Sequence, residues 1–132
     1  MSVLWIAGAS ALGAVARWGL DRAVVRDDPK RAPLGTFVVN ASGSFVAGAL
    51  AGAAASGVVP DPVRTVVAAG FLGSFTTFST WLQQAVAAAQ EGRSGTAAWS
   101  VLGGVTGGGV AVVAGWWVAG WVLSAGGLLV TP

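Results

Sequence analysis

Charged residues are so widely spaced in this sequence that they leave three long uncharged stretches, residues 32–60, 65–90 and 94–132. Each stretch exceeds the roughly 20 apolar residues that a helix needs to cross a bilayer. A fourth uncharged stretch covers residues 1–16 and continues past Arg17 as a mostly apolar run. The chain is therefore expected to be an all-helical, integral membrane protein with four spans.

The expected spans lie within a single domain, residues 1–132, at about residues 2–25, 33–57, 61–90 and 95–125. The first could be mistaken for a signal peptide, but it lacks the basic segment that such a peptide needs, and we interpret it as a retained span. The three connections are short, so successive helices should run antiparallel.

The composition supports a membrane protein and excludes several other classes. Hydrophobic residues make up 55% of the chain and charged residues 9%, whereas a soluble domain carries about 25% charged residues. A net charge of +2 from seven basic and five acidic residues is no basic patch, so no nucleic-acid partner is expected. The sequence contains no Cys and no His, which excludes thiolate chemistry and the commonest general base. No enzyme function is expected.

The segment 70–81 of the third span is rich in hydroxyl groups at membrane depth, since five of the seven residues 74–80 are Ser or Thr. Such hydroxyls can bond back to their own helix, so an uninterrupted helix is one interpretation. However, β-branched threonines and two glycines weaken the helix, and aromatic residues recur at Phe75, Phe78 and Trp81. We interpret the segment as a broken third helix. Its freed carbonyls could hold a cation and its freed N–H groups could attract an anion.

A polar stripe marks the second span. Thr36, Asn40 and Ser44 follow one another at intervals of four residues, which places them on one helix face. Such a stripe can join two helices in lipid, or it can line a hydrated pathway.

Arg17 is a basic residue within the first span. An arginine inside a membrane suggests a functional site, although its side chain could also extend to the interface. No carboxylate lies deep in any expected helix, so a proton-coupled carboxylate relay is not expected. A positive residue without an acidic partner suits an anion better than a metal cation.

These motifs resemble those of the Fluc (CrcB) family of fluoride channels over nearly the whole chain. Residues 13–18 are similar to its G-A-x-x-R-[YW] signature, and the run from Thr36 to Phe45 is similar to G-T-x-x-V-N-x-x-G-S-F. Residues 70–81 are similar to G-F-x-G-x-x-T-T-F-S-T-F. The resemblance implies a passive fluoride-selective channel in the cell membrane that gives resistance to fluoride toxicity.

The resemblance also implies an assembly and a cofactor. Two four-helix subunits would form an antiparallel dimer in the lipid bilayer, with two fluoride pores. A structural sodium ion at the dimer centre would be held by the backbone carbonyls of Gly73 and Thr76. The residues that the resemblance assigns to the fluoride path are Asn40, Phe78, Trp81, Thr36, Ser100 and Arg17.

Two positions depart from the family pattern. Trp81 stands where the family usually has Phe, and its larger ring could narrow the pore. In the fourth helix the family offers a polar residue followed one turn later by Ser, whereas this chain has Ser100 followed by Gly104. Two alternative functions are those of a small multidrug exporter and of a structural subunit. The exporter is disfavoured because no carboxylate lies deep within any expected span. The structural subunit is disfavoured by the polar stripe and the Thr-rich segment.

The charges in the loops predict the orientation of the chain in the membrane, and therefore the subunit with which it pairs. On one side of the membrane the only basic side chain is Arg64, whereas the other side has Arg22, Arg26, Lys30, Arg31 and Arg93. Basic residues bias short loops toward the cytoplasm, so both termini should lie outside. An antiparallel dimer would then need a related subunit of opposite bias. Pairing with itself stays open, because nearby aspartates could mute the bias.

Overall fold

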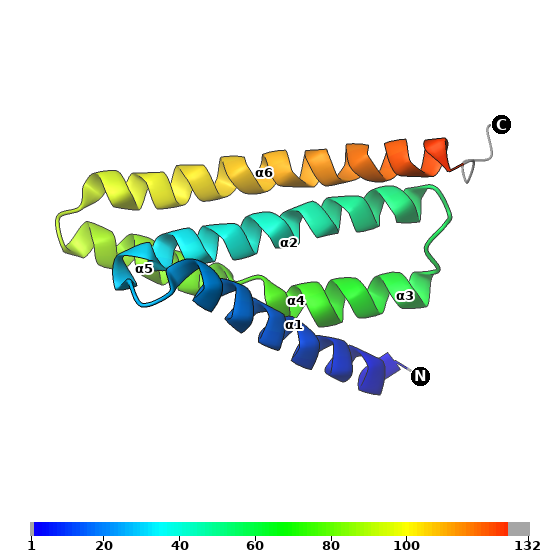
Figure 1. Cartoon of the computed structure of the whole chain (residues 1–132), viewed down its shortest axis with the longest axis horizontal. Coiled ribbons are helices and arrows are strands. Elements are labelled where there is room, and N and C mark those ends of the chain that lie inside the picture. Colours follow the sequence, from blue (N-terminus) through cyan, green and yellow to red (C-terminus); the bar gives the residue numbers. More distant parts are fainter. Residues whose placement is uncertain (1, 127–132) are drawn as a thin grey trace.

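The computed structural model describes residues 2–126, which form helices and turns without any strand in that range (Figure 1). The elements in chain order are α1 (Ser2–Val25), the 3₁₀ turn η1 (Pro29–Arg31), α2 (Ala32–Ala55), α3 (Asp61–Thr65), the π-helical η2 (Val66–Leu72), α4 (Gly73–Phe75), α5 (Phe78–Gln90) and α6 (Ser94–Ala125).

Within residues 2–126, four helical segments are long and apolar enough to cross a membrane: Val3–Val25, Ala32–Ala55, Asp61–Gln90 and Ser94–Ala125. This confirms the expectation of an all-helical protein with four spans. The expected ranges differ from these by at most two residues. The tail expected after the fourth helix lies outside the described residues.

Local sequence signals explain where the spans begin and end. Pro33 and Pro62 lie in the first turns of α2 and α3, where a fixed φ suits a helix and the missing N–H costs nothing. Gly57 and Gly92 have positive φ angles of 73° and 75° after the ends of α2 and α5, a conformation that glycine adopts without steric cost. The beginning of α1, the turn 56–60 and the end of α6 lie at one end of the molecule (Figure 1).

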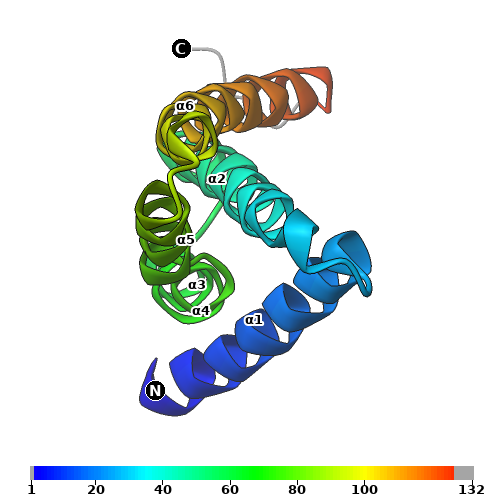
Figure 2. The ribbon, with the colours of Figure 1, turned by 90° about the vertical axis from the view of Figure 1, so that its left-hand side faces the viewer.

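Glycines bring α2 and α6 into close contact where the two helices cross (Figures 1 and 2). Gly48 and Gly52 are buried on α2, and their Cα atoms face the backbone of α6 at Val112 and Trp116. In lipid, helices associate through such close backbone approach because no hydrophobic effect drives them together.

The first span crosses the third in a similar way. Gly13 on α1 lies against the backbone of Phe71, and the Ser10 hydroxyl donates to the Gly70 carbonyl at 3.2 Å. Figure 2 shows α1 running obliquely to the other helices. This packing holds the first half of the third span, including η2, in place.

The third span is irregular in its middle. Residues Val66–Leu72 have π-helical hydrogen bonding, which was not predicted and which is often found at functional sites. α4 ends at Phe75 and α5 begins at Phe78. Between them, Thr76 (φ −82°, ψ 159°) and Thr77 (φ −145°, ψ 117°) have extended backbone.

Candidate functional site

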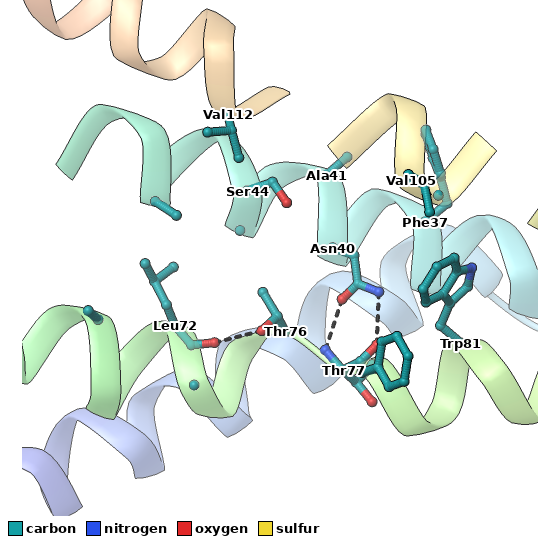
Figure 3. Close-up of a pocket in the computed structure, with 16 residues that line it drawn as sticks. Phe37, Asn40, Ala41, Ser44, Leu72, Thr76, Thr77, Trp81, Val105 and Val112 are labelled. Atoms are coloured by element: carbon teal, nitrogen blue, oxygen red, sulfur yellow. Dashed lines mark hydrogen bonds between the residues drawn. The ribbon is translucent and has the colours of Figure 1, made fainter. Parts of the chain in front are cut away.

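A groove of about 550 Å³ lies where α2, the third span and α6 meet, beside the extended residues Thr76 and Thr77 (Figure 3). It is lined mainly by apolar side chains and backbone, with few polar groups. The lining residues are Phe37, Asn40, Ala41, Gly43, Ser44, Ala47, Ala68, Leu72, Gly73, Thr76, Thr77, Phe78, Trp81, Gly104, Val105 and Val112. None of these residues is charged, so the groove offers dipoles rather than ions to a ligand.

The Asn40 amide bonds to the backbone of Thr77 through both of its polar atoms (Figure 3). Asn40 Nδ2 donates to the Thr77 carbonyl at 2.9 Å, and Asn40 Oδ1 accepts from the Thr77 N–H at 2.8 Å. A backbone N–H can only donate and a carbonyl can only accept, so this pairing determines which way the amide points. One N–H of Asn40 Nδ2 is left for another acceptor.

These bonds change the partners of the carbonyls around the extended residues. In a continuous helix the Thr77 N–H would donate to the Gly73 carbonyl, but here it donates to Asn40. The Thr80 N–H would donate to the Thr76 carbonyl, but it donates to the Thr77 hydroxyl at 3.3 Å, as at a helix N-terminus. The carbonyls of Gly73 and Thr76 therefore lose their helical donors.

Two aromatic rings occupy the start of α5. Phe78 and Trp81 meet edge to face, with ring centroids 5.4 Å apart. Trp81 Nε1 donates to the Ser100 carbonyl of α6 at 2.6 Å, so a hydrogen bond joins the indole to the fourth span. Phe78 is 68% exposed in the single chain, which leaves one side of the groove open.

The structure brings together five of the predicted site residues in this groove: Asn40, Gly73, Thr76, Phe78 and Trp81. Three others do not line it. Thr36 is buried, with 3% of its surface exposed. Ser100 contributes its carbonyl to Trp81, and Arg17 is half-buried on α1.

Two contacts in the site were not predicted from the sequence. Thr77 is the residue to which Asn40 bonds, and a threonine hydroxyl directly before an apolar helix is a known N-cap signal that could have identified it. Gly104 lies against the indole of Trp81, and no local sequence signal indicates that contact.

Within residues 2–126 no group of three or more His, Cys, Asp or Glu side chains is placed to hold a metal ion. A cation in this groove would have to bind backbone carbonyls or hydroxyls. An anion would meet amide and hydroxyl donors and aromatic edges.

Comparison with known proteins decides the family. Residues 4–116 match the family described as CrcB-like protein, Camphor Resistance (CrcB). The chain belongs to the CrcB family. Four membrane-competent helices and this membership make it a multi-pass membrane protein.

Several CrcB relatives carry a functional name. The chain is 43% identical over 89 residues to "Fluoride-specific ion channel FluC 1" of Leifsonia xyli, a match that covers 67% of the chain and 65% of the relative, just under two thirds. It is 39% identical over 98 residues to "Fluoride-specific ion channel FluC" of Acidobacterium capsulatum, covering 74% and 78%. It is 42% identical over 113 residues to "Fluoride-specific ion channel FluC 1" of Natronomonas pharaonis, covering 85% and 88%.

Proposed function

We propose that this protein is a fluoride-selective channel that passively exports fluoride across the cell membrane and protects the cell from fluoride toxicity. The observation that carries the proposal is the Asn40–Thr77 pair in an uncharged groove, in a chain whose CrcB relatives are named fluoride-specific ion channels. Fluoride that enters as neutral HF would leave down its gradient as the anion.

The groove would replace the water around fluoride with a few aligned donors. The second N–H of Asn40 and the Ser44 hydroxyl supply hydrogen-bond donors, and the ring edges of Phe78 and Trp81 carry positive quadrupole character. Once a second subunit covers the open side, closely spaced walls would exclude larger halides. Conduction needs several weak sites rather than one deep one, and these groups are neutral.

Arg17 would act on the approach to the groove rather than in it, whereas Thr36 is buried and would act only through its position on α2. Arg17 lies about two turns before the end of α1 and would attract anions toward the mouth of the path. Thr36 precedes Asn40 by one helical turn on α2. Ser100 would contribute through its carbonyl, which holds Trp81 in place.

The open side of the groove supports an antiparallel dimer. Phe78 is exposed in the single chain, so a second subunit is needed to enclose the ion between protein walls. A two-fold axis in the membrane plane would give the dimer two such paths. The partner would be a related subunit or a second copy of this chain.

The carbonyls of Gly73 and Thr76 fit a structural sodium ion at the dimer centre. Hard cations prefer oxygen ligands, and these two carbonyls have lost their helical donors to the Asn40–Thr77 and Thr77–Thr80 bonds. Sodium would stabilise the extended residues of the third span because it would replace the hydrogen-bond donors that those carbonyls have lost.

Removal of sodium is therefore expected to destabilise the protein. An ion present at 100 times its Kd adds about 2.7 kcal/mol to the free energy of unfolding. Loss of sodium should therefore lower the Tm clearly. The measurement is thermal unfolding of the detergent-purified protein in Na⁺ and in K⁺ at equal ionic strength, with Na⁺ added back as the control. Equal melting temperatures in both salts would contradict the sodium site.

Fluoride efflux from liposomes tests the function. The chain is reconstituted alone and together with a charge-reversed copy of itself, so that both orientations are present. The copy carries the substitutions Ser2→Lys, Arg26→Gln, Lys30→Gln, Arg31→Gln, Val58→Lys and Arg93→Gln. Fluoride release measured with an ion-selective electrode, without chloride release, is expected in at least one preparation. Its absence from both would contradict the proposed function.

Loop charges predict the orientation of the chain. Arg64, the single basic residue at its end of the molecule, forms an ion pair with Asp61 at 3.0 Å. The opposite end carries five basic residues, and two of them pair with acidic neighbours, Arg31 with Asp28 and Arg93 with Glu91. Since acidic residues contribute little to the bias, the chain should insert with both termini outside and pair with a related subunit of opposite bias.

Reporter fusions at the C-terminus measure this orientation. A reporter active only outside the cytoplasm is expected to give a strong signal, and one active only in the cytoplasm a weak one. Equal signals from the chain expressed alone would instead support pairing with itself.

A further inference from the structure

The indole of Trp81 is held in one position by two independent contacts. Its Nε1–H donates to the Ser100 carbonyl of α6 at 2.6 Å, and its ring meets the Phe78 ring edge to face. The N–H is therefore already used. What Trp81 can present to the groove is its carbon-bound ring edge (Figure 3).

Gly104 provides the space in which this indole lies. A Cβ atom at position 104 would lie 2.6 Å from Cζ2, 2.7 Å from Cε2 and 2.8 Å from Nε1 of Trp81. These distances are too short for any side chain, and the indole cannot retreat while its N–H stays bonded to α6. One turn further along, a Cβ on Gly108 would meet only Ser44 Oγ at 3.5 Å, an ordinary contact. Of these two positions on α6, only position 104 therefore requires glycine.

Trp81 and Gly104 also line the same groove as Asn40. Gly104 has no side chain on α6, and the Trp81 ring from α5 fills that space instead. We propose that the Trp81–Gly104 pair sets the width of the conduction path in this chain, with Gly104 as the positioning residue that seats the indole. This inference rests on the proposed fluoride function and names the residues that limit the passage.

A double-mutant cycle tests the pair. Gly104→Ser, Trp81→Phe and the double variant are compared with the native chain in the liposome efflux assay, and Tm and dimer content are measured for each. Gly109→Ser is the matched control, because it makes the same change on the same helix at a position where a Cβ would meet nothing within 4 Å.

Gly104→Ser should lower fluoride efflux at least tenfold by pushing the indole into the groove, whereas Gly109→Ser should change it less than twofold. Trp81→Phe should raise efflux about twofold or more, because the smaller ring widens the path. The double variant should recover at least a third of the native rate, since a phenyl ring without the N–H anchor can turn away from the serine. Opposite effects of Gly104→Ser and Trp81→Phe on efflux would indicate a role in setting the width of the path. A loss of folding would instead lower Tm and efflux together.

Native efflux in a folded Gly104→Ser variant would overturn the inference while leaving the proposed function intact. Loss of efflux in Trp81→Phe would also overturn it, as would a double variant no better than Gly104→Ser. If the native chain, present in both orientations, releases no fluoride, the proposed function fails and this inference falls with it.

Discussion

Asn40→Asp is expected to abolish most fluoride efflux while the protein still folds. An ionised aspartate can accept from the Thr77 N–H as Asn40 does, but its second oxygen would face the Thr77 carbonyl, to which Asn40 Nδ2 now donates at 2.9 Å. It would also put a negative acceptor where fluoride needs a donor. Losing a hydrogen bond to a charged group costs about 1.5–3 kcal/mol, so a fall in rate of about 10- to 100-fold is expected at 1.36 kcal/mol per factor of ten.

The matched control is Ser42→Ala. Ser42 lies two residues from Asn40 on α2, outside the groove, and its hydroxyl bonds only to the Val39 carbonyl of its own helix. Its removal should leave efflux unchanged. Native efflux from Asn40→Asp would remove Asn40 from the fluoride path.

A pH series on Asn40→Asp adds a readout that does not depend on transport. A protonated aspartate can again donate to the Thr77 carbonyl and accept from its N–H. The difference in Tm between the variant and the native protein should therefore shrink as the pH is lowered through the carboxyl pKa. A difference that stays constant or grows would mean that the pairing with Thr77 does not determine stability.

Gly48→Ala is expected to be one of the most destabilising of the glycine-to-alanine substitutions. The new Cβ would meet the Val112 carbonyl oxygen, and would lie 2.7 Å from its carbonyl carbon and 2.9 Å from its Cα. Because these are backbone atoms, α2 and α6 would have to separate. Overpacking costs about 1–3 kcal/mol or more, whereas the gain in helix propensity returns only about 1 kcal/mol.

Thermal unfolding and the fraction of monodisperse protein in detergent measure this effect. Gly109→Ala on α6 is the control, since its Cβ would have open space, and it should be neutral or slightly stabilising. If Gly48→Ala were as stable as that control, close packing of α2 on α6 would not be a major source of stability.

Hydropathy and charge spacing were sufficient to predict the four spans. In a bilayer every backbone polar group must be bonded internally, so a long uncharged segment has little choice but to form a helix. The same reasoning could not predict the π-helical turns at Val66–Leu72. The same segment packs against α1 through Gly13 and Ser10, and those contacts join residues about 60 positions apart, which local patterns do not reveal.

The site was predicted only in part, for a related reason. Asn40 and the Thr-rich segment 70–81 stand out because polar groups are rare at membrane depth, and this signal is local. The bonding of the Asn40 amide to Thr77 spans 37 residues of sequence. An N-cap signal points to Thr77, but no sequence pattern indicated that Asn40 would bond to its backbone and take the N–H that the Gly73 carbonyl would otherwise receive.

The sequence by itself determined that this chain crosses the membrane four times, which residues carry unusual polarity there, and where the loop charges lie, because these properties depend on residue type and short-range spacing. Only the tertiary structure decided that Trp81 reaches across to Ser100 and that Gly104 must lack a side chain to admit it. At the level of sequence these were two unrelated departures from a family pattern. They become one feature because α5 and α6 pack closely enough that the volume added on one helix must be removed from the other.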